Sequence, residues 1–94
     1  MNHVVFFRFQ SQEDAREAAE RLRGLMGVVD TLRSIEVGVD ELRTDRSWDL
    51  CLITRFDDKA AMDAYQAHPA HQEVVAFIRE RATSAAAVDW SSPA

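Results

Sequence analysis

Residues 3–9 read HVVFFRF, an unbroken run of β-branched, aromatic and apolar residues that is typical of a β-strand. Successive side chains of a strand point to opposite faces, so the odd-numbered residues from His3 to Phe9 share one face and the even-numbered residues from Val4 to Arg8 share the other. Both faces are largely apolar. Because a small antiparallel sheet normally leaves one face to water, this strand predicts a sheet covered on both sides, with a partner subunit as one of the covers.

The middle of the chain predicts one helix and two further strands. Ser11 is a good N-cap for a helix whose small and apolar residues recur at helical spacing from Ala15 to Met26, and Gly24 and Gly27 mark its end. Strict alternation predicts a strand over residues 32–39, and a polar turn then leads to a third strand over residues 48–56. One side of that third strand carries large apolar residues, namely Trp48, Leu50, Leu52 and Phe56.

The last third of the chain completes the fold. Asp58 can cap a short helix, Pro69 opens a second helix that runs to about Ala82, and residues 85–90 can form a final strand. The order strand, helix, strand, strand, helix pair, strand is that of an α+β, ferredoxin-like βαββαβ protomer with a four-stranded antiparallel sheet. We expect residues 1–94 to form one domain with helices on one sheet face. The other face is expected to pair with that of a second copy in a homodimer.

Residues 65–71 read YQAHPAH and hold two of the three histidines and the only tyrosine of the chain. Proline is tolerated in the first turn of a helix, so His68 and Pro69 should end one helix and begin the next. His71 then lies in the first turn of the second helix. There the unpaired amides and the helix dipole favour a neutral imidazole, which can accept a proton near physiological pH.

These polar residues are expected to meet at one end of a pocket. His71 shares an apolar helical stripe with Val74 and Ile78, and Tyr65 lies on a similar stripe, so both should point toward the sheet. If the His3 face of the first strand meets the helices, His3, Tyr65 and His71 converge. One imidazole can then take a proton while the other imidazole, or the phenol, donates to a developing oxyanion. Such a set suits enolisation or intramolecular condensation of a carbonyl compound and needs no cofactor.

Other interpretations of the same residues stay open. His3 and His71 could hydrogen-bond each other and only fix the helix on the sheet. The three histidines could supply nitrogens to zinc, although the spacing from His68 to His71 spans the proline and no acidic ligand is obviously placed, so we expect no metal. His68 is expected to face solvent at the helix junction, and Cys51 to be a small buried apolar residue.

Charge and composition limit the possible partners. The 11 basic and 16 acidic residues give a net charge of −5, which argues against nucleic acid as a partner. The single Cys51 cannot form an internal disulfide. The sequence has no apolar run long enough to cross a bilayer and no basic-then-apolar signal pattern, so we expect no membrane association and a cytoplasmic location.

Taken together, several segments resemble the stress-responsive dimeric A/B barrel (Dabb) domain family. The resemblance covers essentially the whole chain, and its most specific part is the Tyr-x-x-His-Pro-x-His run combined with the N-terminal His3. It implies a ferredoxin-like protomer whose sheet pairs with that of a second copy to form a dimeric α/β barrel. The matching segments are residues 3–9, 37–40, 48–50, 55–57, 65–71 and 88–90.

The resemblance also suggests an activity. The family includes a plant polyketide cyclase that closes an aromatic ring by intramolecular aldol condensation; its catalytic pair matches His3 and His71 by motif, and a pocket tyrosine matches Tyr65. That cyclase type has a second tyrosine on its first helix, where this chain has Leu22 or a neighbour, so we do not expect the same substrate. We expect a small-molecule pocket protein acting as a cofactor-independent lyase or cyclase on a polyketide-like or other carbonyl compound. The alternative is a non-catalytic, stress-associated structural homodimer.

Overall fold

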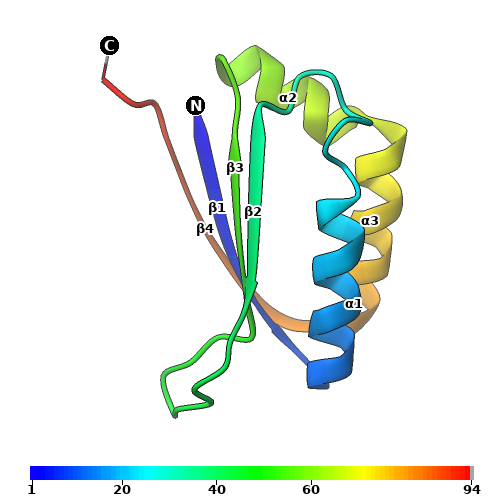
Figure 1. Ribbon diagram of the computed structural model, residues 1–94, viewed down its shortest axis with the longest axis vertical. Coiled ribbons are helices and arrows are strands. Elements are labelled where there is room, and N and C mark those ends of the chain that lie inside the picture. The colour runs from blue at the N-terminus through cyan, green and yellow to red at the C-terminus, as the bar shows by residue number, and fades with distance from the viewer. Residues whose placement is uncertain (94) are drawn as a thin grey trace.

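The computed structural model describes residues 1–93 and has the predicted ferredoxin-like α+β fold. The strands form one antiparallel sheet in the order β2-β3-β1-β4. Figure 1 shows the helices gathered on one face of this sheet. The elements are β1 (Asn2–Phe9), α1 (Gln12–Arg23), β2 (Ser34–Val39), β3 (Leu50–Arg55), α2 (Lys59–Ala67), α3 (Pro69–Arg81) and β4 (Ala82–Trp90).

The helices begin where the sequence predicts, because each start has a side chain that satisfies a free amide. The Ser11 hydroxyl accepts from the N–H of Asp14 at the start of α1, and the Asp58 carboxylate accepts from the N–H of Ala61 at the start of α2. At the start of α3, Pro69 follows the cap residue His68. The strand β4 begins at Ala82, three residues earlier than predicted.

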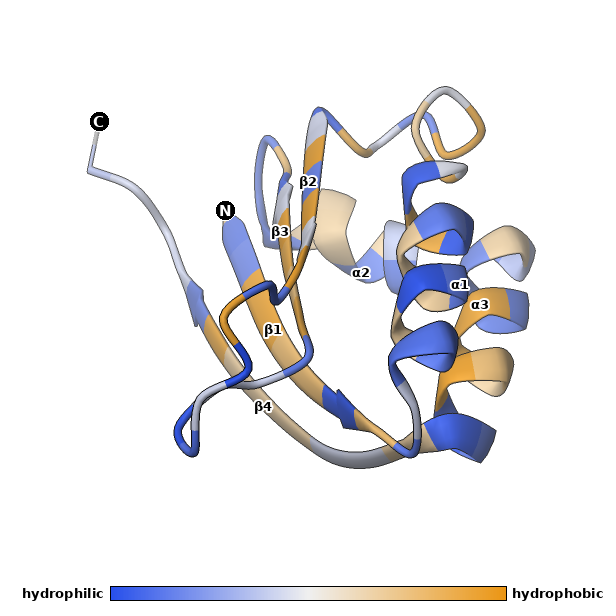
Figure 2. Cartoon of the chain, turned by 60° about the horizontal axis from the view of Figure 1, so that its bottom comes forward, coloured by the Kyte–Doolittle hydropathy of each residue, from blue (hydrophilic) through white to orange (hydrophobic). Residues whose placement is uncertain are grey.

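The register across the sheet defines rows of side chains on the helix-facing side. One row runs from Val37 on β2 through Leu52 on β3 and Val5 on β1 to Ala87 on β4. The first three are buried, at 8%, 3% and 8% exposure, whereas Ala87 is exposed. Figure 2 shows the hydrophobic residues running along the inner strands, while α1 and α3 alternate between hydrophobic and hydrophilic segments. The core therefore lies under β2, β3 and β1 and thins out toward β4.

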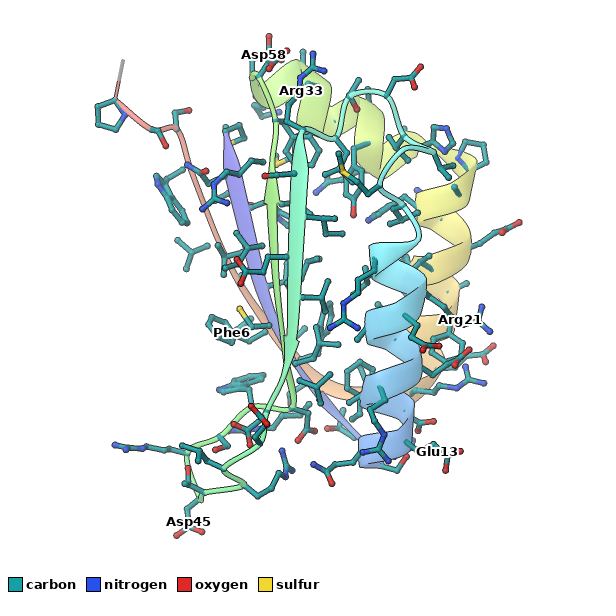
Figure 3. The ribbon with its side chains drawn as sticks, in the orientation of Figure 1. Phe6, Glu13, Arg21, Arg33, Asp45 and Asp58 are labelled. Carbon is teal, nitrogen blue, oxygen red and sulfur yellow. The ribbon has the colours of Figure 1, made fainter. Side chains whose placement is uncertain are left out.

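The opposite sheet face carries large apolar side chains without a cover in the protomer. Phe6, Val88 and Trp90 are exposed by 38%, 59% and 45%, and Figure 3 shows Phe6 pointing away from the helices. Trp48 also belongs to this face, since its ring lies 6.3 Å from the Phe6 ring and 4.2 Å under the guanidinium of Arg8. The predicted position of Trp48 on the Leu50 side was therefore wrong.

The error at Trp48 has a local cause. The strand β3 begins only at Leu50, and the intervening Asp49 is buried. Its carboxylate accepts from the N–H of Phe9 at 2.7 Å, and its own N–H donates to the carbonyl of Phe7. Because Asp49 bonds to β1 in this way, the two-residue alternation of β3 does not extend back to Trp48.

None of the helices within residues 1–93 is both long enough and apolar enough to cross a bilayer.

Candidate functional site

A cavity of about 420 Å³ lies between α3 and the sheet, on the side of β1 and β4. Its size falls in the range of about 300–1,000 Å³ that is usual for small-molecule sites. The wall is mostly apolar and includes Val5, Phe7 and Ile78. The cavity is open because β4 is exposed along most of its length instead of being covered by a helix. The polar lining residues are His3, Gln66, His71, Arg79, Thr83 and Ser84.

His71 is held by the end of the preceding helix. Its Nδ1 lies 3.2 Å from the carbonyl oxygen of Gln66, in the last turn of α2, where carbonyl groups have no partner within the helix. A carbonyl oxygen can only accept, so Nδ1 carries the proton. In the neutral ring, Nε2 then has a free lone pair and can act as a base.

The surroundings of His71 favour that neutral ring. The side chain is half-buried, and this burial is the largest cause of a pKa lowered from its ordinary value of 6.5. The hydrogen bond to Gln66 opposes the shift, whereas the nearby imidazoles of His3 and His68 add to it. The direction agrees with the expectation from the sequence, but burial, and not the helix terminus, is the main cause.

His3 is held by a carboxylate from the neighbouring strand. His3 and Asp89 are register partners of β1 and β4, and His3 Nδ1 is hydrogen-bonded to Asp89 Oδ1. A carboxylate accepts, so Nδ1 again carries the proton and Nε2 is the nitrogen left for a ligand. When His3 is protonated, Asp89 also forms an ion pair with it. The His3 side chain is 13% exposed and that of Asp89 is 43% exposed.

The two histidines are brought together by the fold without bonding to each other. Both line the same cavity, as the sequence pattern predicts. Within residues 1–93 no hydrogen bond joins His3 to His71; each Nδ1 instead bonds to a different partner. The interpretation in which the two imidazoles hydrogen-bond each other is therefore wrong.

Tyr65 lies under His71 and not in the cavity. Its side chain is completely buried, with its ring 4.4 Å from the His71 ring and 5.0 Å from the Phe56 ring. Its hydroxyl has no hydrogen-bond partner among the residues that the structure describes, and burial raises the pKa of Tyr65 to about 12. Tyr65 does not line the cavity, so its predicted role as a proton donor stays a prediction.

The remaining candidate residues have local roles. His68 is half-buried, and its Nδ1 accepts from the N–H of Ala70 at 3.0 Å, so this imidazole caps α3. In the described part of the chain, no three histidine, cysteine or acidic side chains lie close enough together to hold a metal ion. Cys51 is half-buried, and burial is the largest cause of a raised pKa of its thiol.

Sequence reasoning missed Asp89, which holds His3, and Arg79, which lines the cavity. Asp89 was noticed only as part of the segment 88–90, and the signal for its role is an acidic residue within an otherwise small and apolar strand. Arg79 looked like an ordinary basic residue of the last helical turn, and it lines the same cavity as the histidines.

Solved structures share the whole fold. A dimeric ferredoxin-like protein of unknown function from Bacteroides fragilis is 23% identical, with a TM-score of 0.87 over 97% of this chain and 94% of that one. Another, from Thermobifida fusca, is 22% identical, with a TM-score of 0.81 over 93% and 85% of the two chains. A hydroxynitrile lyase from Passiflora edulis is 16% identical, with a TM-score of 0.78 over 98% and 95%.

Sequence comparison gives the family. No curated protein sequence matches the chain. Residues 1–92 match the model of the stress responsive A/B barrel domain, which spans β1 to β4 and both segments that supply the histidines. The chain therefore belongs to the stress responsive A/B barrel domain (Dabb) family.

Proposed function

We propose that this protein is a homodimer that binds a small, mostly apolar carbonyl compound in the cavity and acts on it as a cofactor-free lyase or cyclase. The observation that carries this proposal is a pair of imidazoles that line the same cavity, His3 from the sheet and His71 from α3, each anchored through Nδ1. His71 is bound to a backbone carbonyl and His3 to a carboxylate, so the two rings are suited to different roles.

In the proposed reaction, Nε2 of neutral His71 removes a proton from the carbon next to the substrate carbonyl. The electrons of that C–H bond form the enolate, and protonated His3 gives its Nε2 proton to the enolate oxygen. Asp89 stabilises the charged form of His3 before the transfer. In a cyclase the enol carbon then attacks a second carbonyl carbon; the enol O–H returns its proton to His3 as the first carbonyl re-forms, and protonated His71 gives its proton to the new alkoxide, so both histidines regain their starting states. In a lyase the sequence runs in reverse: His71 removes the proton of a β-hydroxyl, the electrons of the carbon–carbon bond pass to the enol as His3 protonates its oxygen, and the enol carbon finally takes up the proton from His71 while the enol O–H returns its proton to His3.

The exposed sheet face supports the homodimer. Phe6, Val88 and Trp90 would leave a large apolar surface in water, and such surfaces mark interaction sites. The similar proteins from Bacteroides fragilis and Thermobifida fusca are both described as dimers. We expect Phe6→Arg to convert the protein to a monomer in analytical ultracentrifugation, because the substitution places a charge in the proposed interface. An unchanged dimer mass would place the interface elsewhere.

The catalytic proposal is tested by deuterium exchange at the carbon next to the carbonyl of 2-nonanone, followed by proton NMR in D₂O. This uncharged ketone exchanges slowly on its own and needs only the enolisation half of the reaction. We expect the wild-type protein to accelerate exchange and His3→Gln or His71→Gln to lower the rate by about 10²- to 10⁴-fold, the usual contribution of general acid–base catalysis. The control is His68→Asn, which keeps a capping side chain on α3.

A wild-type rate equal to that of free imidazole at the same concentration would overturn the catalytic proposal. An unchanged rate in both histidine variants would do so as well. Either result would favour the alternative, a non-catalytic structural homodimer.

A further inference from the structure

The cavity has a second polar end. Arg79 follows His71 by about two turns of α3, which is about 12 Å along the helix axis. Both side chains line the same cavity, and the wall between them is apolar, including Val75 and Ile78 of the same helix. A ligand that touches both ends must therefore be elongated, with an apolar middle.

A β-bulge brings two hydroxyl groups to the Arg79 end. The pairing of β1 with β4 shifts between Arg8, which pairs with Ser84, and Phe9, which pairs with Ala82. Thr83 is thus the extra residue of β4, and both Thr83 and Ser84 line the cavity. Bulges of this kind often re-aim side chains beside functional sites.

Arg79 lacks an acidic partner, unlike its neighbour on the helix. Among residues 1–93 no carboxylate lies within salt-bridge distance of Arg79, whereas Arg81 pairs with Asp14 and Glu80. The chain as a whole carries a net charge of −5. The unpaired guanidinium of Arg79 is therefore a local positive charge on the cavity wall of an acidic protein. An arginine fork and two hydroxyl donors match the oxygens of a single carboxylate.

We propose that the cavity selects a carbonyl compound bearing a distal carboxylate, with Arg79, Thr83 and Ser84 binding the carboxylate while the carbonyl lies at His3 and His71. Arg79 is then a specificity-determining residue. The placement of the carbonyl rests on the proposed function, but the binding of the carboxylate can be measured without any turnover.

The test compares the binding of 8-oxononanoate with that of its methyl ester by isothermal titration calorimetry. The two compounds share the chain and the ketone and differ at the far end, which is a charged carboxylate in the acid and a neutral methyl ester in the other. We expect the wild-type protein to bind the acid at least about tenfold more tightly than the ester, since hydrogen bonds to charged groups are the stronger ones. Arg79→Gln should remove this preference, chiefly by weakening the binding of the acid.

The matched control is Arg16→Gln, which removes the same charge from an exposed position on α1 outside this cavity and should keep the preference for the acid. Because Arg79 is exposed, both variants should melt within a few degrees of the wild type. Equal affinity of the wild-type protein for acid and ester would overturn the proposal, as would an intact preference in Arg79→Gln.

One more variant separates this proposal from the catalytic one. His71→Gln should retain the preference for 8-oxononanoate over its ester, because the carboxylate end is about 12 Å away along the helix. If His71→Gln retains the preference for the acid and the wild type does not accelerate deuterium exchange, recognition of the carboxylate stands and the catalytic proposal is overturned. Exchange of 2-nonanone without any acid preference would overturn only the role of Arg79.

Discussion

The two edge strands of the sheet, β2 and β4, differ in what covers them. Val37 on β2 is buried under α1, and the guanidinium of Arg23 on that helix donates to the Val37 carbonyl at 2.8 Å. Ala87, in the same row on β4, is exposed. Figure 1 shows β4 running away from the helices toward the C-terminus. The covered edge strand, β2, contributes to the core. The uncovered edge strand, β4, leaves room for the cavity that His3 lines, and its Asp89 is hydrogen-bonded to His3.

The largest expected effect comes from the uncovered edge. Asp89→Asn should lower the rate of ketone deuterium exchange by about 100-fold, equivalent to about 2.7 kcal/mol, because the amide no longer stabilises protonated His3. The free energy of unfolding should change little, since the Asp89 side chain is 43% exposed and not part of the core. As a control, Asp57→Asn removes a carboxylate from the exposed pair with Arg33 and should leave the rate unchanged. A wild-type rate in Asp89→Asn would remove this residue from the site.

A substitution on the covered edge strand, β2, should instead act on the free energy of unfolding. Val37→Ala removes two buried methyl groups and should lower the free energy of unfolding by about 2 kcal/mol, which corresponds to a fall in Tm of roughly 10 °C. Ala87→Val adds the same volume at the exposed end of the row and should change stability by less than about 0.5 kcal/mol. Both are measured by urea unfolding at one fixed protein concentration. Equal losses in the two variants would show that β4 is as well packed as β2.

A smaller effect is expected at Tyr65, between the core and the cavity. Its buried hydroxyl has no partner among residues 1–93, so Tyr65→Phe should raise the free energy of unfolding by about 1 kcal/mol. The ring contact with His71 is kept, and the exchange rate should stay the same. A more than tenfold loss of rate would instead identify the phenol as the proton donor.

The smallest effect is a pH dependence. Since burial lowers the pKa of His71 below its ordinary 6.5, the unfolded chain binds its proton more readily than the folded protein. The contribution of His71 to stability is therefore fully present above pH 6.5 and is lost as the pH falls from there through the lowered pKa. His71→Gln should flatten this part of the stability curve. Identical slopes in His71→Gln and the wild type would contradict the assignment.

Local rules were sufficient to predict the fold. Ser11, Asp58 and Pro69 signal helix starts through their own side chains or ring, and the two-residue and helical periodicities identify which faces are apolar. The positions of His3 and His71 on one cavity followed from the same periodicities. The errors arose where the local pattern is interrupted, as at Trp48, which is separated from β3 by the buried Asp49.

Features of the site that the sequence did not predict depend on the pairing of strands that are far apart in the chain. His3 and Asp89 are 86 positions apart, and no local pattern gives the register that pairs them. The bulge at Thr83 is likewise a property of two strands together. Whether Tyr65 lines the cavity or lies beneath its wall depends on the packing of its ring between Phe56 and His71, which spacing along a helix cannot resolve.

The central claim is that His3 and His71 present their Nε2 atoms to one ligand. A ¹⁵N NMR spectrum of the selectively labelled histidines, recorded above pH 7 with and without 8-oxononanoate, tests it most directly. We expect His71 to carry its proton on Nδ1 and the compound to shift both Nε2 signals with one dissociation constant. A His71 ring protonated on Nε2, or a compound that binds while both Nε2 signals stay in place, would contradict the account.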